Sequence, residues 1–403
     1  MLCRTGRLPP GRWERMPNNS KIVKKANSYL VLNAIRKQTG ITVEGIGDAT
    51  GLSRPTVLSI LKKLLEDDLV TTSGTAQTDS GRHPVLYALN ATRHYVVGID
   101  VDGPPINLVV ADLNGEVQYS ATWTIQLTDT GEAIAATILA EIDKAIQTLH
   151  ISRAKILGIG VGLPAVVDIA ANRAVRISRL PQWNDYPLAD AIARHTGARV
   201  YIRNDAHLLG MAEHSMAANA DNTLYIVHRS GIGMSIMIGN QPYEGAMGNS
   251  GYIGHTTLVV GGRACDCGAH GCFEAYCSKR AIRRDYTEAG GDDIDYTEIL
   301  RRAQLGEPLA LDIFQRAGAL FGVAISNLVK NFEIYTVILG DMICDEHHPF
   351  FRTITEAAVQ NLHNYTHHPP CIIRGHLDSH SFGLGGCHLV LSKFFAHPKL
   401  RLQ

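Results

Sequence analysis

The sequence predicts a mixed α/β protein, with an N-terminal winged helix-turn-helix followed by a two-lobed α/β body. Three observations predict this class. Apolar residues recur at helical spacing over residues 20–66. From residue 95 onward, buried strand-like runs alternate with crossover helices, and the same plan then repeats. The charge of the chain also divides between these two parts.

Length and composition allow two to four packed domains. The chain has 403 residues, of which 45% are hydrophobic and 19% charged, so it has material for cores and too few charges for a disordered chain. No continuous apolar run approaches the ~20 residues of a membrane helix. Residues 1–19 lack the apolar core of a secretory signal, and we expect a flexible basic tail in which Met16 is an alternative start to Met1.

Net neutrality hides an asymmetry of charge. The 38 basic and 38 acidic side chains cancel. Residues 1–92 hold 13 Lys and Arg against 7 Asp and Glu, a difference of +6, which leaves 25 against 31, or −6, for residues 93–403. A basic N-terminal part on an acidic body favours a nucleic-acid partner for the N-terminal part alone.

Residues 20–92 have the pattern of a winged helix-turn-helix. One amphipathic helix is predicted over 20–40 and a short one around 43–49, then a tight turn at Gly51. Ser53 is the expected N-cap of the next helix, with Pro55 in its first turn. Residues 69–89 read as two strands around a polar tip, which is the expected wing.

The second helix of such a unit reads the major groove of DNA with its N-terminal end. Its exposed face and the wing supply the candidate contacts to double-stranded DNA, which are Ser53, Arg54, Thr56, Ser59, Lys62, Lys63 and Arg82. The alternative is a small helical domain that binds another protein.

The body then shows a specific resemblance. The segments GNSGYIGHTTL and CDCGAHGCFE, preceded by IRNDAHLLGMAE and SGIGMSIMIG, resemble the signature of the ROK family of repressors, open reading frames and kinases. With a winged helix in front, the layout is that of the family's N-acetylglucosamine-repressor and Mlc-type regulators. The resemblance implies an actin-like, ribonuclease-H-like fold for residues 93–403.

A zinc site is expected in the loop 255–272. His255, Cys265, Cys267 and Cys272 offer one nitrogen and three sulfurs, the donors that a closed, structural zinc ion takes. Cys277 is the competing thiol, and the alternative is a cluster of buried free cysteines.

The resemblance also implies a sugar site. The positions that match the family's sugar contacts are Asn204, Asp205, His255 and Glu274, while the family glutamate before Ile-Gly-His is Tyr252 here. Ala165 is a second departure, because the family usually has glycine there. Tyr252 puts the usual hexose contact in doubt, so the effector is a sugar or a sugar phosphate of unspecified identity.

The nucleotide motif is degraded. In ROK kinases Asp-x-Gly-Gly-Thr-Lys holds the phosphates, and the matching stretch Asp100–Pro105 reads Asp-Val-Asp-Gly-Pro-Pro. Prolines offer no N–H to a phosphate. The second phosphate turn, residues 229–233, looks better preserved. No ATP and no kinase activity are therefore expected, and Asp205 would be the catalytic base only if activity survived.

These features predict a cytoplasmic, nucleoid-associated transcriptional regulator of carbohydrate metabolism. We expect it to be a sugar-responsive repressor that acts as a homodimer or homotetramer without membrane insertion. Two alternatives remain: an active sugar kinase with a DNA-binding extension, and a regulator that responds to a protein partner through its body.

Overall fold

The computed structural model describes residues 20–76, 83–102, 105–126, 128–177, 183–184, 186–216, 222–229, 231–239, 241–341, 345–377 and 381–396, apart from the side chains of 20–22. The chain divides into two compact units. The smaller unit comprises Met1–Asn90 with Phe394–Gln403, and the larger unit comprises Ala91–Lys393.

The smaller unit is a winged helix-turn-helix, as predicted. Its elements are α1 (Ser20–Lys37), α2 (Val43–Thr50), α3 (Arg54–Glu66), β1 (Val70–Thr75) and β2 (Val85–Leu89). Thr42 caps α2 by accepting a hydrogen bond from the Gly45 N–H at 3.1 Å. Gly51 ends that helix with φ of 71°, a left-handed conformation that glycine adopts without strain. Strands β1 and β2 pair antiparallel and form the wing.

The last residues of the C-terminal helix α12 (Leu384–Phe395) group with the smaller unit. The Phe395 carbonyl accepts a hydrogen bond from Asn33 Nδ2 at 2.9 Å, and the Arg36 guanidinium lies 4.3 Å from the centre of the Phe395 ring. The sequence had suggested a division at residue 92 with the whole of 93–403 in one body.

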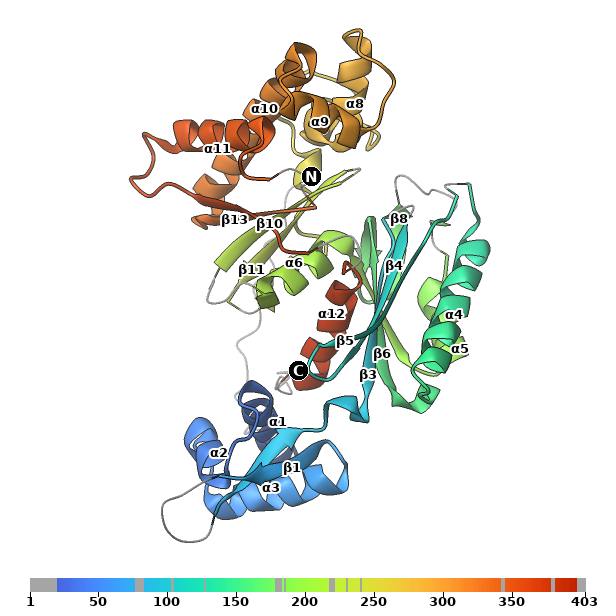
Figure 1. Cartoon of the computed structure of the whole chain (residues 1–403), viewed down its shortest axis with the longest axis vertical. Coiled ribbons are helices and arrows are strands. Elements are labelled where there is room, and N and C mark those ends of the chain that lie inside the picture. The colour runs from blue at the N-terminus through green and yellow to red at the C-terminus, as the bar shows by residue number, and fades with distance from the viewer. Residues whose placement is uncertain are drawn as a thin grey trace, which may run out of the picture. The chain divides into compact units, whose positions relative to one another are not determined.

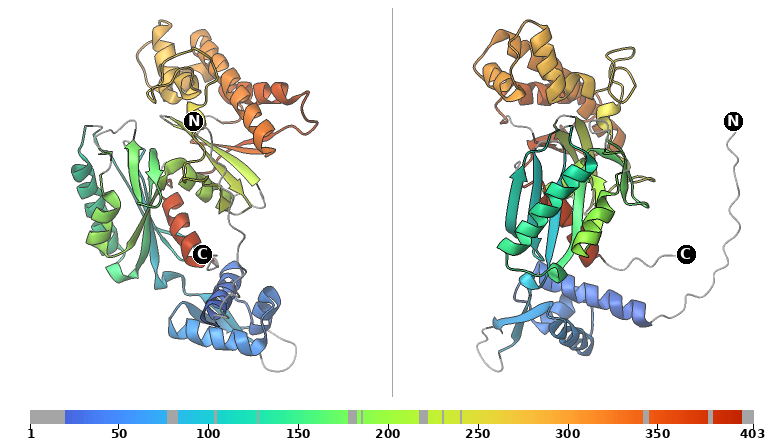
Figure 2. Two further views of the ribbon diagram at one scale, coloured as in Figure 1. Left: turned by 180° about the vertical axis from the view of Figure 1, so that it is seen from behind. Right: turned by 90° about the vertical axis from the view of Figure 1, so that its right-hand side faces the viewer.

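The first lobe of the larger unit is a five-stranded sheet of order β5-β4-β3-β6-β9. The strands are β3 (Tyr95–Asp100), β4 (Ile106–Asp112), β5 (Val117–Trp123), β6 (Ile156–Leu163) and β9 (Arg199–Asn204). Helices α4 (Gly131–Thr148) and α5 (Leu188–Thr196) cover one face, and α12 lies on the other (Figures 1 and 2).

The second lobe repeats this plan with the order β12-β11-β10-β13-β14. Its strands are β10 (Asn222–His228), β11 (Ile232–Ile238), β12 (Gln241–Pro242), β13 (Thr336–Gly340) and β14 (Cys371–Arg374). In both sheets the central strand pairs antiparallel with the strand that follows it and parallel with a later one. Helix α6 (Asp205–Met216) lies between the two sheets (Figure 1).

Most helices of the second lobe lie beyond its sheet, on the side away from the first lobe (Figure 1). They are α7 (Glu274–Cys277), α8 (Lys279–Glu288), α9 (Tyr296–Gln304), α10 (Pro308–Phe332) and α11 (Pro349–Leu362). Within the described residues, α10 is the one helix long and apolar enough, by length and composition, to cross a membrane. Its side chains Ile313, Phe314 and Phe321 belong to the buried core of this lobe.

Backbone contacts fix α12 against the first sheet. A Cβ added at Gly98 of β3 would lie 1.7 Å from the Gly383 carbonyl oxygen, and one at Gly160 of β6 would lie 2.3 Å from that of Gly386. Only glycine permits this approach. The carboxyl ends of β3 and β9 in one lobe, and of β10 and β13 in the other, carry the residues of the cleft described below, which is where open α/β sheets bind ligands.

Candidate ligand-binding cleft and metal cluster

One pocket between the two lobes collects all five predicted sugar contacts. Its lining includes Asn204, Asp205, Tyr252, His255 and Glu274. The structure therefore brings together residues that lie up to 70 positions apart in the chain. The wall also includes Arg176 from the hairpin of β7 (Ala165–Asp168) and β8 (Arg173–Ile177), which the sequence did not single out.

Asn204 and Asp205 lie where β9 passes into α6. Asn204 Oδ1 accepts a hydrogen bond from the Ala206 N–H at 3.1 Å, so this side chain does act as a cap on the helix. Its amide nitrogen lies 3.4 Å from the Ala165 carbonyl oxygen. Asp205 is 7% exposed. Burial and the neighbouring Asp102 carboxylate raise the pKa of Asp205 to about 7, since both disfavour its charged form.

The two departures from the family pattern contact one another. The Tyr252 hydroxyl donates a hydrogen bond to the Ala165 carbonyl oxygen at 2.6 Å. A glutamate at position 252 could not donate to that carbonyl unless it were protonated. The phenol proton is therefore used within the protein, and the phenol oxygen remains an acceptor for a ligand hydroxyl.

His255 and Glu274 face the same pocket from the second lobe. The His255 ring stacks on the Tyr252 ring with centres 6.4 Å apart. Glu274 Oε2 accepts a hydrogen bond from the Ile232 N–H at 3.1 Å. A Cβ at Gly231 would lie 2.5 Å from this carboxylate, so a larger residue there would displace the Glu274 side chain. Glu274 is thus fixed by the turn after β10.

The four expected metal ligands converge. The donor atoms of His255, Cys265, Cys267 and Cys272 all lie within 4.8 Å of one another. Cys267 Sγ and Cys272 Sγ are 3.7 Å apart, and Cys265 Sγ and His255 Nδ1 are 3.6 Å apart. Tetrahedral zinc with Zn–S of about 2.3 Å and Zn–N of about 2.0 Å requires edges of roughly 3.8 and 3.5 Å.

The electrostatics of this cluster also fit a cation. Burial and the adjacent Cys267 and Cys265 thiols raise the pKa of Cys272 to about 12. Three thiolates held this closely repel one another, and a divalent ion would remove that penalty. The geometry and the donor set therefore fit a closed, four-ligand zinc site.

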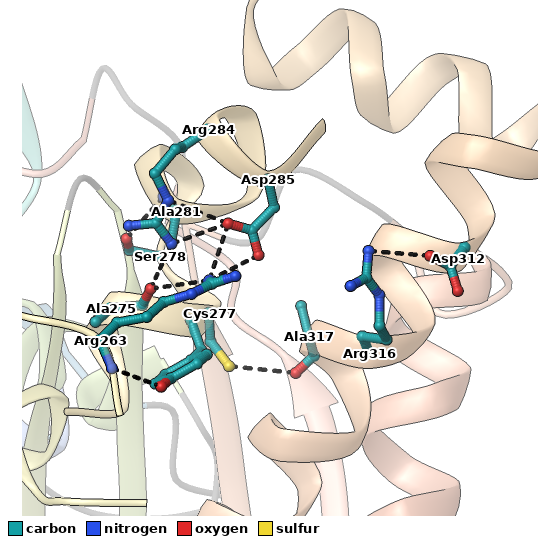
Figure 3. Close-up of polar contacts among 11 residues, drawn as sticks. Arg263, Ala275, Cys277, Ser278, Ala281, Arg284, Asp285, Asp312, Arg316 and Ala317 are labelled. Atoms are coloured by element: carbon teal, nitrogen blue, oxygen red, sulfur yellow. Dashed lines mark hydrogen bonds and ion pairs between the residues drawn. The ribbon is translucent and has the colours of Figure 1, made fainter. Parts of the chain in front are cut away.

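Cys277 does not compete for this site. It is fully buried, and its thiol donates to the Ala317 carbonyl of α10 at 3.3 Å (Figure 3). Beside it, the Arg263 guanidinium binds the Asp285 carboxylate at 2.8 Å, and this ion pair ties the start of the cysteine loop to α8 (Figure 3).

The structure adds a residue that sequence reasoning missed. Arg229, directly after β10, carries a side chain that is 6% exposed and surrounded by carboxylates. Its guanidinium lies 2.9 Å from Asp100, 3.8 Å from Asp102, 3.5 Å from Asp205 and 3.6 Å from Asp341. The signal in the sequence was a charged residue where the family turn has glycine.

Arg229 is the first residue of the second phosphate turn, and its side chain lies among the carboxylates beside that turn. In the first phosphate stretch, Asp100 and Asp102 both face Arg229. Gly103, Pro104 and Ser230 lie outside the described residues.

The candidate DNA contacts lie in the smaller unit. Along α3 and its N-cap, Ser53, Arg54, Ser59, Lys62 and Lys63 are exposed and Thr56 is half-buried. Ser53 begins the helix as predicted, but its hydroxyl lies 2.9 Å from that of Thr56 rather than bonding a backbone N–H. Arg54 forms an ion pair with Glu44 of α2. Arg82 lies outside the described residues.

A winged helix-turn-helix joined to a two-lobed, cleft-containing body defines a class of ligand-binding proteins that also carry a nucleic-acid-binding fold. The ROK family profile matches residues 96–393, and the MarR family profile matches residues 25–80. The chain therefore belongs to the ROK family.

Individual relatives agree with this assignment. The chain is 28% identical over 378 residues to the xylose repressor of Bacillus subtilis (strain 168), covering 92% of this chain and 96% of that one. It shares the fold of a ROK family transcriptional regulator described as a homologue of the E. coli Mlc protein, with a TM-score of 0.78, 22% identity, and coverage of 93% and 97%. The ROK hexokinase from Thermus thermophilus matches with a TM-score of 0.63 and 29% identity, covering 73% of this chain and 97% of that one.

Proposed function

We propose that this protein is a sugar-responsive, DNA-binding transcriptional repressor of carbohydrate metabolism. The observation that carries the proposal is the combination, in one chain, of a basic winged helix-turn-helix with a cleft that gathers Asn204, Asp205, Tyr252, His255 and Glu274. The xylose repressor of Bacillus subtilis, similar over almost the whole chain, supports it. An intracellular site, at the nucleoid, follows from operator DNA as the partner.

The effector is a sugar bound by hydrogen bonds in this cleft. Asp205 and Glu274 offer acceptors, Tyr252 offers an acceptor oxygen, and the Asn204 amide and His255 ring complete the set. Because the carboxylates make the pocket acidic, a neutral sugar is favoured over a sugar phosphate. A zinc ion held by His255, Cys265, Cys267 and Cys272 would fix the loop that presents His255 and Glu274 to the sugar.

Phosphoryl transfer is lost in this proposal. That reaction needs a triphosphate cradled by backbone N–H groups and neutralised by metal ions. Here Asp102 and Pro105 stand in the first phosphate stretch where the family motif has glycine and lysine, and Arg229 adjoins the second. The similarity to the Thermus thermophilus hexokinase keeps a sugar kinase as the second candidate. Release of ADP from ATP on addition of a sugar would favour that candidate.

The test is operator binding by the full chain. We expect a labelled DNA fragment from upstream of its own gene to be bound in fluorescence anisotropy at low salt, more weakly as salt rises. One sugar of a panel including D-xylose, D-glucose and N-acetylglucosamine should weaken binding at least tenfold. Lys63→Ala should reduce the salt slope by about one.

Lys144→Ala is the matched control, because Lys144 is an exposed helical lysine on α4 of the larger unit. It should leave the salt slope unchanged. If the protein binds no DNA at low salt, with or without these sugars, the proposed function is wrong.

A further inference from the structure

Arg229 lines the cleft together with Asp102 and Asp205. Four carboxylates converge on Arg229 from three separate segments of the chain. Asp100 and Asp102 follow β3 and Asp205 opens α6, while Asp341 directly follows β13 in the other lobe. The Arg229–carboxylate distances run from 2.9 to 3.8 Å, and every side chain involved is at most 20% exposed.

Arg229 is held rigidly in this position. One face of its guanidinium stacks on the Phe382 ring, 4.1 Å from the ring centre. Its backbone N–H donates to the Gly231 carbonyl at 2.9 Å. Asp341 is fixed as well, since it has a φ of 52° and its carboxylate also binds Lys279 Nζ at 3.0 Å. The arrangement is therefore built into both lobes.

Two of these carboxylates, Asp100 and Asp205, are buried and the other two are partly buried, so the cluster needs compensating positive charge, because an unpaired buried charge is strongly unfavourable. Carboxylate oxygens are the ligands that hard divalent cations such as Mg²⁺ and Mn²⁺ prefer. A guanidinium is always charged, so it can compensate the same negative charges. We propose that Arg229 is a resident substitute for a divalent cation in this carboxylate cluster, which fixes the cleft for ligand binding alone.

A phosphate-binding role for Arg229 is less consistent with these contacts. Its Nη2, Nη1 and Nε atoms lie 2.9 to 3.8 Å from aspartate oxygens as ion pairs, although Nη1 and Nη2 make no hydrogen bond to the described residues. With Lys279 included, two positive charges face four carboxyl groups, so an approaching phosphate would meet a net negative environment. Burial and the other aspartates raise the pKa of Asp205, which is consistent with an excess of acid at this point.

This proposal rests on the proposed loss of phosphoryl transfer and gives a structural reason for it. A kinase must admit a metal-bridged triphosphate, and the pairing of these four carboxylates with Arg229 leaves none of them free to serve as a metal ligand.

The test is Mn²⁺ binding by full-length protein, followed by electron paramagnetic resonance. Mn²⁺ prefers oxygen ligands and does not compete for the cysteine cluster. Arg229→Met keeps most of the side-chain volume and removes the charge. We expect this variant to bind one Mn²⁺ per chain at least tenfold more tightly than the wild type, and to gain thermal stability on adding Mn²⁺. The double variant Arg229→Met with Asp100→Asn should lose both the Mn²⁺ binding and the gain in thermal stability.

Arg203→Met is the matched control. Arg203 is equally buried, but its ion pair is with Glu244 alone, at 3.1 Å, so its loss leaves one carboxylate and should create no Mn²⁺ site. Arg229→Lys keeps the positive charge and should bind no Mn²⁺. This variant also provides a test of the proposal if Arg229→Met does not fold. The proposal fails if folded Arg229→Met gains no Mn²⁺, if Arg229→Lys gains it, or if the wild type binds Mn²⁺ in a manner lost on Asp100→Asn. DNA release by sugar is measured separately, so its failure would leave this result standing.

Discussion

Asp205 makes the stability of the protein depend on pH. Its pKa of about 7 in the folded protein lies above the usual value near 3.8, because burial and Asp102 oppose its ionisation. The folded state therefore retains a proton that the unfolded state has released, and stability should fall as pH rises from about 4 to about 7. Asp205→Asn should remove this dependence. In thermal denaturation, the Tm of the variant should therefore fall less between pH 5 and pH 8 than the Tm of the wild type.

Asp143 provides a control of opposite sign. Hydrogen bonds from Arg153 and His195 lower the pKa of Asp143 despite partial burial. Its contribution to the stability of the fold is therefore present above the pKa that it has in the unfolded chain, and it is lost as pH falls. Asp143→Asn should therefore cost stability near neutrality. A Tm profile for Asp205→Asn that paralleled the wild type over pH 5–8 would contradict the assigned pKa.

At the scale of elements, the cysteine loop after η4 (Ile253–His255) tests the metal assignment. Cys272 is a fully buried ligand candidate, and Cys277, five residues on, is equally buried but bonds the Ala317 carbonyl. We expect Cys272→Ser to reduce zinc from one ion to less than about 0.1 per chain, measured by elemental analysis of purified protein, and to weaken the sugar response.

Cys277→Ser is the matched variant. It should lower Tm, because a hydroxyl replaces a buried thiol, but it should keep its zinc. Equal zinc content in both variants would show that the ligand set is wrong.

The continuous buried strands could be predicted from the sequence, whereas several shorter elements were missed. Strands β3 and β4 are buried along their whole length and read as continuous apolar runs. The hairpin β7–β8 and helices α8 and α9 were missed. Strands β7 and β8 have only four and five residues, whereas the buried side chains of α9 do recur at helical spacing and could have been recognised.

The candidate site shows the same limit. His255 and the three cysteines could be grouped from spacing and donor chemistry, and the sugar contacts from a family motif. The Arg229 cluster could not, since its carboxylates come from segments near residues 100, 205 and 341 that only the folded sheets bring together. A single arginine beside a glycine turn carries no periodic signal.

At the scale of the whole molecule, the division of charge agrees with the division into units. The excess of six basic side chains lies in residues 1–92, which contain α3, and the acidic excess lies in residues 93–403. An acidic larger unit would be repelled by DNA phosphates, so contact with DNA would be confined to the smaller unit. One helix-turn-helix unit covers few base pairs, which favours two units acting together in a homodimer.

Two such units related by a two-fold axis must meet half-sites about one helical turn, 10–10.5 base pairs, or a multiple of it apart. The operator should therefore be an inverted repeat. Inserting five base pairs between its halves turns one of them to the opposite face of the duplex, and affinity measured by anisotropy should fall toward that of a single half-site. Inserting ten base pairs restores the face and should recover binding at least in part. Equal affinity for the five- and ten-base-pair insertions would mean that the units bind independently, and the sugar would then have to act within each unit rather than through the spacing of a pair.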